Sequence, residues 1–174
     1  MQDIEILNNS YLIIGAPNTK KSEVSRLLSK EFNYKLINLD REKHAFFNDF
    51  TDYDFDIYQN LKEKKGEVSA INYIHKYEMK HLNYVLDNLS SVSVIDFGNT
   101  YTLIDDKELL DKVKLFKNIV LLESDRTYKN SFENKLKDNK INKLISTINI
   151  SIVNKSVNDI ITEIINHKEF KNIL

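Results

Sequence analysis

In residues 11–22 the types and the spacing of the side chains indicate a chemical function more clearly than anywhere else in this sequence. An apolar run leads into Gly15, and Lys21 and Ser22 then open a segment in which apolar residues recur at helical spacing. Backbone N–H groups of a loop between a strand and a helix can surround a phosphate, and the helix dipole adds positive potential behind it. A lysine in this position reaches the outer phosphates, while the hydroxyl beside it binds Mg²⁺. The spacing therefore indicates a phosphate-binding loop of the pattern G-x-x-x-x-G-K-[ST].

One position departs from that pattern, because Lys20 stands where the second glycine is expected. Glycine allows close approach of a ligand, or a left-handed backbone that costs other residues ~1–2 kcal/mol. The Lys20 side chain could clash with a phosphate or supply a second cation beside it. An ordinary turn is the alternative, because Pro17, Asn18 and Thr19 favour a turn on their own. We interpret the segment as a nucleotide-binding loop that consists of Gly15, Asn18, Thr19, Lys20, Lys21 and Ser22.

Strand-like and helix-like segments alternate along the rest of the chain. Short apolar runs predict strands over residues 11–15, 35–39, 92–97, 118–123 and 148–153. Helical periodicity predicts helices over residues 21–32, 70–89 and 106–116, and a last helix after Ser156, with Asp159 in a capping box. The aromatic and acidic stretch 42–64 suggests short helices and loops, and 124–143 is polar and rich in lysine. This alternation predicts an α/β fold, a three-layer α/β/α sandwich around a five-stranded parallel sheet.

Carboxylates and glycines follow the predicted strands at the edge where ligands bind in parallel sheets. Asp96 ends the third strand and could hold the hydration shell of Mg²⁺, or it could simply begin a turn before Gly98. Asp40 follows the second strand and could accept the proton of a substrate hydroxyl, or it could cap a helix. We therefore expect Lys21 and Asp40 as catalytic residues, Ser22 and Asp96 as metal ligands, and Asp40 and Gly98 at the acceptor.

Composition narrows the classes of protein to consider. With 174 residues, of which 41% are hydrophobic, the chain is expected to form one domain over residues 1–174. The net charge of −1 offers no basic surface field, so nucleic acid is not expected as a partner. No apolar run approaches 18 residues, so no membrane association is expected. The absence of cysteine excludes disulfides and zinc–thiolate sites, and it fits a cytoplasmic protein.

Once these segments are in order, nearly the whole chain resembles the shikimate kinases, within the larger group of small P-loop kinases. Gly15, Lys21 and Ser22 match the family's loop, and Asp40 matches the second aspartate of its D-x-D motif. The first aspartate is replaced by Asn38. The resemblance implies the P-loop fold, ATP and Mg²⁺ as cofactors, residues 42–68 on the substrate side, and residues 124–143 as a lid-like segment. It also implies that Gly98-Asn99-Thr100 stands at the family's triple glycine.

Arginines that the family uses are missing from this sequence. The position of the substrate-binding arginine is occupied by Ile71 or His75, depending on the alignment. Residues 124–143 contain a single arginine, Arg126, and no proline. Two functions therefore stay open. One is an ATP-dependent small-molecule kinase with an altered acceptor. The other is a catalytically inactive kinase-like protein that acts through protein contacts. A nucleoside or polynucleotide kinase is a third interpretation.

Overall fold

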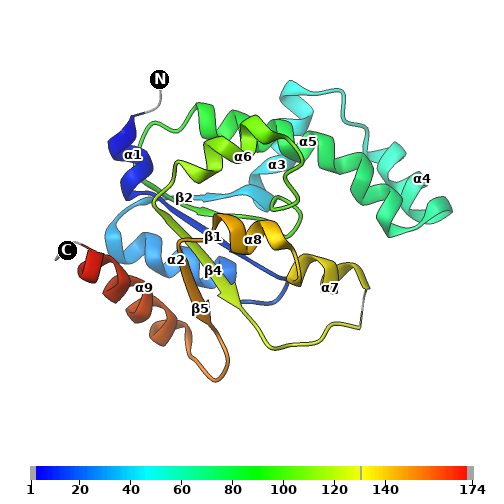
Figure 1. The fold of residues 1–174 in the computed structure, drawn as a ribbon. Helices are drawn as coiled ribbons and strands as arrows, with labels where there is room; N and C mark the ends of the chain where they lie inside the picture. Colours follow the sequence, from blue (N-terminus) through cyan, green and yellow to red (C-terminus); the bar gives the residue numbers. More distant parts are fainter. Residues whose placement is uncertain (1–2, 130, 172–174) are drawn as a thin grey trace.

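A parallel sheet forms the centre of the molecule. The computed structural model describes residues 3–129 and 131–171. Within them, five strands pair in the order β2-β3-β1-β4-β5, and every pair is parallel. The strands are β1 (Tyr11–Gly15), β2 (Lys35–Asn38), β3 (Ser93–Asp96), β4 (Asn118–Glu123) and β5 (Ile148–Ser151). Helices lie on both faces of this sheet (Figure 1), so the predicted three-layer α/β/α sandwich is confirmed.

Each face of the sheet carries its own hydrophobic cluster. On one face, α2 (Lys21–Phe32) and α9 (Val157–Lys171) pack against Tyr11 and Ile13 of β1. On the other, α1 (Ile4–Asn9), α5 (Glu67–Asp87), α6 (Lys107–Lys114) and α8 (Lys140–Ile145) pack against Leu12 and Ile14. This alternation follows from the two-residue period of a strand, and β1 is buried throughout because it is the middle strand.

The remaining helices lie toward the carboxyl ends of the strands (Figure 1). They are α3 (Leu39–Phe50), α4 (Phe55–Lys65) and α7 (Ser131–Lys137). Phe47 of α3 joins Ile74 and Tyr77 of α5 in a third apolar cluster, against which Tyr53 and Tyr58 pack. The aromatic residues of the stretch 42–64 thus hold α3 and α4 against the long helix α5.

Several element boundaries differ from those expected. Strand β2 ends at Asn38, whose side chain accepts a hydrogen bond from the Arg41 amide (2.9 Å) and caps α3. Asp40 therefore lies in the first turn of α3, and the alternative that Asp40 itself caps a helix is wrong. The long helix begins at Glu67, three residues before the expected start. Helix α1 was not anticipated, whereas the capping box of Ser156 and Asp159 is confirmed by their reciprocal hydrogen bonds.

None of the helices in the described part of the chain combines the length and the apolar character that crossing a membrane requires.

His81 of α5 is a buried polar group in the core beside α3. Its Nδ1 lies 2.7 Å from the hydroxyl of Tyr101, and its side chain is 2% exposed. Burial lowers the pKa of His81 to about 4, and the charge of Lys43 acts in the same direction. The folded protein therefore holds this imidazole neutral at pH values where an unfolded chain would protonate it.

We predict that His81 makes the folded state less stable as the pH falls from about 6.5 to about 4. The unfolded chain binds a proton in this interval that the folded protein does not, so stability rises with pH across it. His81→Asn keeps a polar side chain without the titration. As the pH falls, the melting temperature of His81→Asn should decrease less than that of the wild type. The exposed control His167→Asn should show the same pH dependence as the wild type. A constant difference between His81→Asn and wild type across this interval would contradict the prediction.

Candidate functional site

The loop after β1 turns tightly over the end of the sheet, and Gly15 makes this possible. Gly15 has φ +153, and a Cβ there would lie 2.7 Å from the Leu122 carbonyl oxygen and 2.8 Å from Thr19 Oγ1. Any other residue would therefore collide with β4. Thr19 Oγ1 donates a hydrogen bond to the Ala16 carbonyl (2.8 Å), which closes the turn. The first glycine of the pattern thus has a steric reason to be glycine.

Lys20 adopts the left-handed conformation that glycine usually provides at this position. Its φ and ψ are 64 and 15, and Asn18 also has a positive φ of 59. The Lys20 side chain reaches the loop between β5 and α9, where Nζ donates to the Lys155 carbonyl (2.8 Å). The ammonium is therefore bonded to a neighbouring loop, and the loop keeps its shape at the cost of a strained residue.

Lys21 begins α2 and is almost completely buried, with 8% of its surface exposed. Its Nζ donates to the Ala16 carbonyl (2.8 Å) and to Asn99 Oδ1 (2.9 Å). Burial lowers the pKa of Lys21 to about 8, although the negative charges of Asp96 and Asp40 act to raise it. These bonds hold an ammonium at the mouth of the loop, where it could bind a phosphate.

Ser22 and Asp96 meet at the same place. Burial raises the pKa of the Asp96 carboxyl, while a hydrogen bond with Ser22 and the charge of Lys21 lower it. Asn38 Nδ2 also donates to Asp96 Oδ2 (2.6 Å). No cluster of three or more His, Cys, Asp or Glu side chains suited to a metal occurs among residues 3–129 and 131–171. A hydroxyl and one carboxylate nevertheless suit Mg²⁺, which keeps several waters and takes further oxygens from phosphates.

Asp40 lies against the loop that follows β3. A Cβ on Gly98 would lie 2.3 Å from Asp40 Oδ1, so only glycine lets the carboxylate take this position. Lys43 Nζ lies 3.1 Å from Asp40 Oδ1 and 2.8 Å from Glu78 Oε1. Thr100 Oγ1 donates to Glu78 Oε2 (2.6 Å). A chain of polar contacts therefore leads from the sheet edge into α5.

A cavity of about 270 Å³ brings most of the predicted site residues together. Gly15 and Gly98 shape its surroundings without lining it. Lys43, Glu78 and Thr100, which no sequence pattern marks as site residues, extend the polar contacts of Asp40. The cavity is lined by Asn18, Thr19, Lys20, Lys21, Ser22, Glu23, Asp40, Asp96, Phe97 and Asn99.

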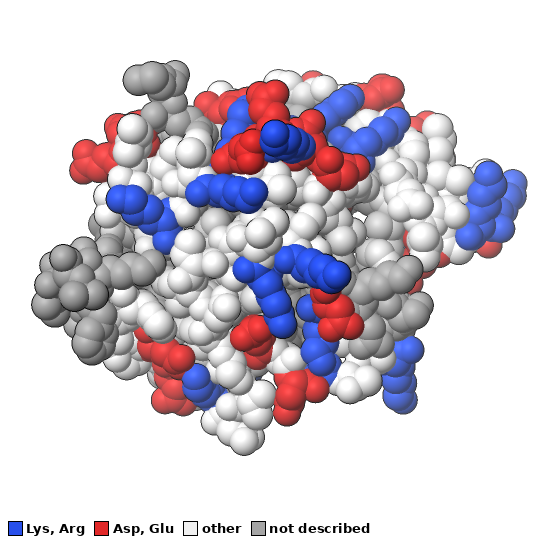
Figure 2. Space-filling model, in the orientation of Figure 1, with Lys and Arg blue, Asp and Glu red and all other residues white. Residues whose placement is uncertain are grey.

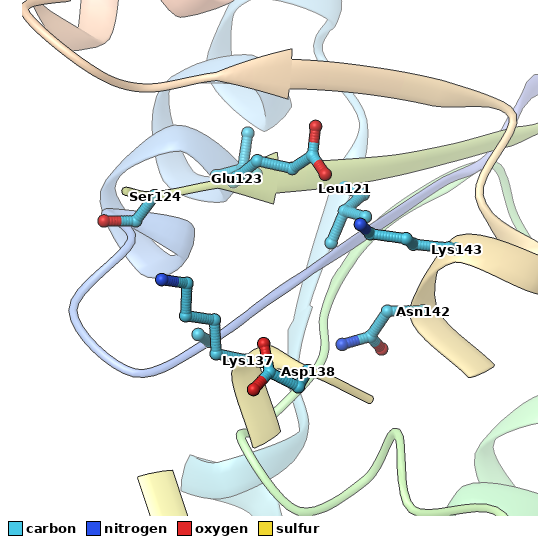
Figure 3. Close-up of a pocket in the computed structure, with 9 residues that line it drawn as sticks. Leu121, Glu123, Ser124, Lys137, Asp138, Asn142 and Lys143 are labelled. Carbon is cyan, nitrogen blue, oxygen red and sulfur yellow. The ribbon is translucent and has the colours of Figure 1, made fainter. Parts of the chain in front are cut away.

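The segment 124–143 contacts the phosphate-binding loop from the other side. Tyr128 is buried, and its hydroxyl donates to the Pro17 carbonyl (2.5 Å). Figure 3 shows Lys137 and Lys143 reaching from α7 and α8 toward the end of β4, around a second cavity of about 170 Å³ that Ala16 also lines. Lys137 Nζ donates to the Arg126 carbonyl (2.8 Å). The side chain of Lys135, another lysine of this segment, lies outside the described part of the structure.

The positions that the resemblance assigns to arginines lie apart from the 270 Å³ cavity. His75 faces Asp105, with Nε2 3.6 Å from Oδ1, and the Arg126 guanidinium lies 5.9 Å from the centre of the Tyr128 ring. None of the described residues that line the cavity is an arginine. Its cations are lysines alone.

Solved structures of small kinases superpose on almost the entire chain. A shikimate kinase from Acinetobacter baumannii, solved with shikimate, has a TM-score of 0.68 at 18% identity, covering 97% of this chain and 96% of that one. A shikimate kinase from Aquifex aeolicus has a TM-score of 0.62 at 21% identity, covering 94% and 98%. A dephospho-CoA kinase from Campylobacter jejuni has a TM-score of 0.55 at 14% identity, covering 93% and 96%.

No protein-family model matches the sequence, and neither does a curated protein. At identities of 14 to 21%, the structural likeness concerns the fold and carries no substrate with it. The chain has the fold of the small P-loop kinases, and solved shikimate kinases are among its structural neighbours.

Proposed function

We propose that this protein is an ATP-dependent phosphotransferase that acts on a small molecule. The observation that carries the proposal is the convergence of Lys21, Ser22 and Asp96 on one cavity, which Asp40 also lines. The small P-loop kinases among its structural neighbours use ATP and Mg²⁺ in general. Here the nucleotide would be bound by Gly15, Asn18, Thr19, Lys20, Lys21 and Ser22.

Each residue of the cavity would have a separate role in phosphoryl transfer. The Lys21 ammonium would neutralise charge on the phosphates, and the loop N–H groups would orient them. Ser22 and Asp96 would hold Mg²⁺, which when bound neutralises further phosphate charge. Asp40 would accept the proton of the acceptor hydroxyl as its oxygen bonds to the terminal phosphorus and the nucleoside diphosphate leaves. Gly98 leaves room for the Asp40 carboxylate beside the loop that follows β3.

Two segments would complete the site. Residues 42–68, which include most of α3 and all of α4, would form the substrate side. Residues 124–143 would act as a lid-like segment, supported by the contact between Tyr128 and Pro17.

An inactive protein that acts through protein contacts is the second candidate, and an aromatic surface favours it. Phe50 is 62% exposed, and its ring stacks on Phe46 (5.4 Å between centroids) and on Tyr84 (5.3 Å). These rings line a hollow of about 530 Å³ together with Leu36 of the edge strand. Exposed apolar surface of this kind often marks a partner site. Nucleic acid is not favoured, because acidic and basic side chains are interspersed over the face in Figure 2.

We expect ATP with Mg²⁺ to raise the melting temperature, and Lys21→Ala to abolish the shift. A ligand at 100 times its Kd stabilises a protein by ~2.7 kcal/mol, which a melting curve detects. Lys30→Ala is a matched control, because that lysine is exposed in the last turn of α2 and lies outside the cavity lining. Absence of a shift at millimolar nucleotide would contradict the proposal and leave the second candidate.

We expect Lys20→Gly to strengthen nucleotide binding, measured by calorimetric titration. Glycine takes up a φ of 64 without strain, and the backbone can then approach a phosphate more closely. A gain of ~1 kcal/mol corresponds to less than tenfold in affinity. Lys20→Ala is the control, since it removes the hydrogen bond to Lys155 but keeps the Cβ. A clear loss of affinity in both variants would mean that the Lys20 ammonium binds phosphate itself.

We expect that shikimate is not phosphorylated. Its carboxylate needs a cation, and neither Ile71 nor His75 offers the forked contact of an arginine. Each lost charge-assisted contact costs ~1.5–3 kcal/mol, so two losses weaken binding by roughly a hundredfold or more. A coupled assay should show no saturable shikimate-dependent ATP consumption. Turnover of ~1 s⁻¹ or more, an ordinary rate for an enzyme, would contradict this.

A further inference from the structure

A single ammonium lies between two carboxylates at the acceptor end of the cavity. Lys43 is the cation nearest to Asp40, and its Nζ bonds both Asp40 (3.1 Å) and Glu78 (2.8 Å). Burial alone would lower the pKa of Lys43, but the two carboxylates raise it above its ordinary value. The Lys43 ammonium is therefore committed to two carboxylates and is not available to an incoming anion.

The other cations of the cavity, Lys20 and Lys21, are those assigned above to the nucleotide. Lys20 donates to the Lys155 carbonyl, and Lys21 donates to Ala16 and Asn99 at the end where phosphate would bind. An anionic acceptor would meet Asp40, whose side chain is 48% exposed, without a free cation to offset the repulsion. Like charges placed together in this way are a strong means of rejecting a ligand.

A cationic acceptor gains little from the same arrangement. Asp40 is already offset by Lys43, and a second ammonium would compete with it. Glu78 cannot receive such a cation, because its side chain is 1% exposed and its two oxygens are bonded to Lys43 and Thr100. Of these two carboxylates only Asp40 is accessible to an acceptor. Asp40 is paired with Lys43, and its remaining oxygen has to accept from the reacting hydroxyl.

We propose that the acceptor is an uncharged polyhydroxyl compound, such as a sugar or a polyol. This inference rests on the proposed phosphotransferase function and names its substrate class. Asp40 Oδ2, which has no hydrogen-bond partner among the described residues, can accept from the reacting hydroxyl. The Asn99 side chain, which lines the same cavity, can bond a neighbouring hydroxyl.

The reaction is balanced with a nucleoside triphosphate as the other substrate. The acceptor oxygen forms a bond to the terminal phosphorus, and the bond from that phosphorus to the bridging oxygen breaks. The hydroxyl proton passes to Asp40, and the bridging oxygen leaves as part of the nucleoside diphosphate. Asp40 then releases the proton to solvent, so the products are a phosphate monoester, the diphosphate and a proton.

Three hexoses that share one ring but differ in charge test this inference. Glucose is neutral, glucuronate is anionic and glucosamine is cationic near neutral pH. Wild-type protein with ATP and Mg²⁺ is assayed for acceptor-dependent ADP release, and mass spectrometry identifies the phosphorylated product. Xylitol and xylonate form a second, acyclic pair. We expect kcat/KM for each neutral compound to exceed that of its acid by about 100-fold, as one uncompensated like-charge contact predicts.

Glu78→Gln tests whether the positioning of Lys43 sets this preference. The amide oxygen can still accept from Lys43 or Thr100, but one negative charge is removed, so Lys43 is released from one carboxylate. The ratio between neutral and anionic acceptors should fall at least about tenfold. Glu31→Gln, exposed near the end of α2 and outside the cavity lining, is the matched control and should leave the ratio unchanged. A purely structural role of Glu78 would lower both rates together and also leave the ratio unchanged.

The outcomes separate this inference from the function on which it rests. Turnover of glucuronate or glucosamine in preference to glucose would overturn it, and so would failure of every neutral compound while Lys21-dependent ATP binding persists. An unchanged ratio in Glu78→Gln would overturn the role assigned to Lys43. If Lys21-dependent ATP binding is itself absent, the proposed function fails first. Should Glu78→Gln not fold, as judged by circular dichroism, the wild-type ratio alone decides.

Discussion

The buried carboxylate of Asp96 is the contact on which the arrangement of the site depends. Asp96 ends β3 beside the central strand, receives a hydrogen bond from Asn38 at the end of β2, and bonds Ser22 in the first turn of α2. A buried charge is tolerated only when it is bonded, so these partners cannot separate without leaving it bare. One side chain thereby ties together the start of the helix behind the phosphate loop and the start of α3, which carries Asp40.

Much of the architecture could be predicted because it depends on local patterns. Apolar runs of strand length alternate with helical periodicity, and this alternation is enough to specify a parallel sheet with helices on both faces. The end of β2 was misjudged because Leu39 continues an apolar run, whereas the capping side chain of Asn38 had already ended the strand. Helix α1 is short and lacks a clear apolar period, so nothing in its sequence distinguished it from a polar terminus.

The site was predictable only where its residues are neighbours in the sequence or end a strand. Lys21 and Ser22 follow from the loop pattern, and Asp40 and Asp96 follow from the rule that strand ends share an edge. Lys43 and Glu78 were not predicted as site residues, because their contact joins residues 35 positions apart on two helices. No local pattern in the sequence indicates how these helices pack. Their spacing in the sequence carries no helical or strand signal that could connect them.

The hydrogen bond from Tyr128 to the Pro17 carbonyl also fixes the orientation of a peptide group. In a trans peptide the carbonyl and the following N–H point in opposite directions, and none of the described peptide bonds is cis. Since the carbonyl of Pro17 is directed at Tyr128, the N–H of Asn18 is directed away from it. The segment 124–143 thus determines, through a single phenol, which way one of the loop's backbone dipoles faces.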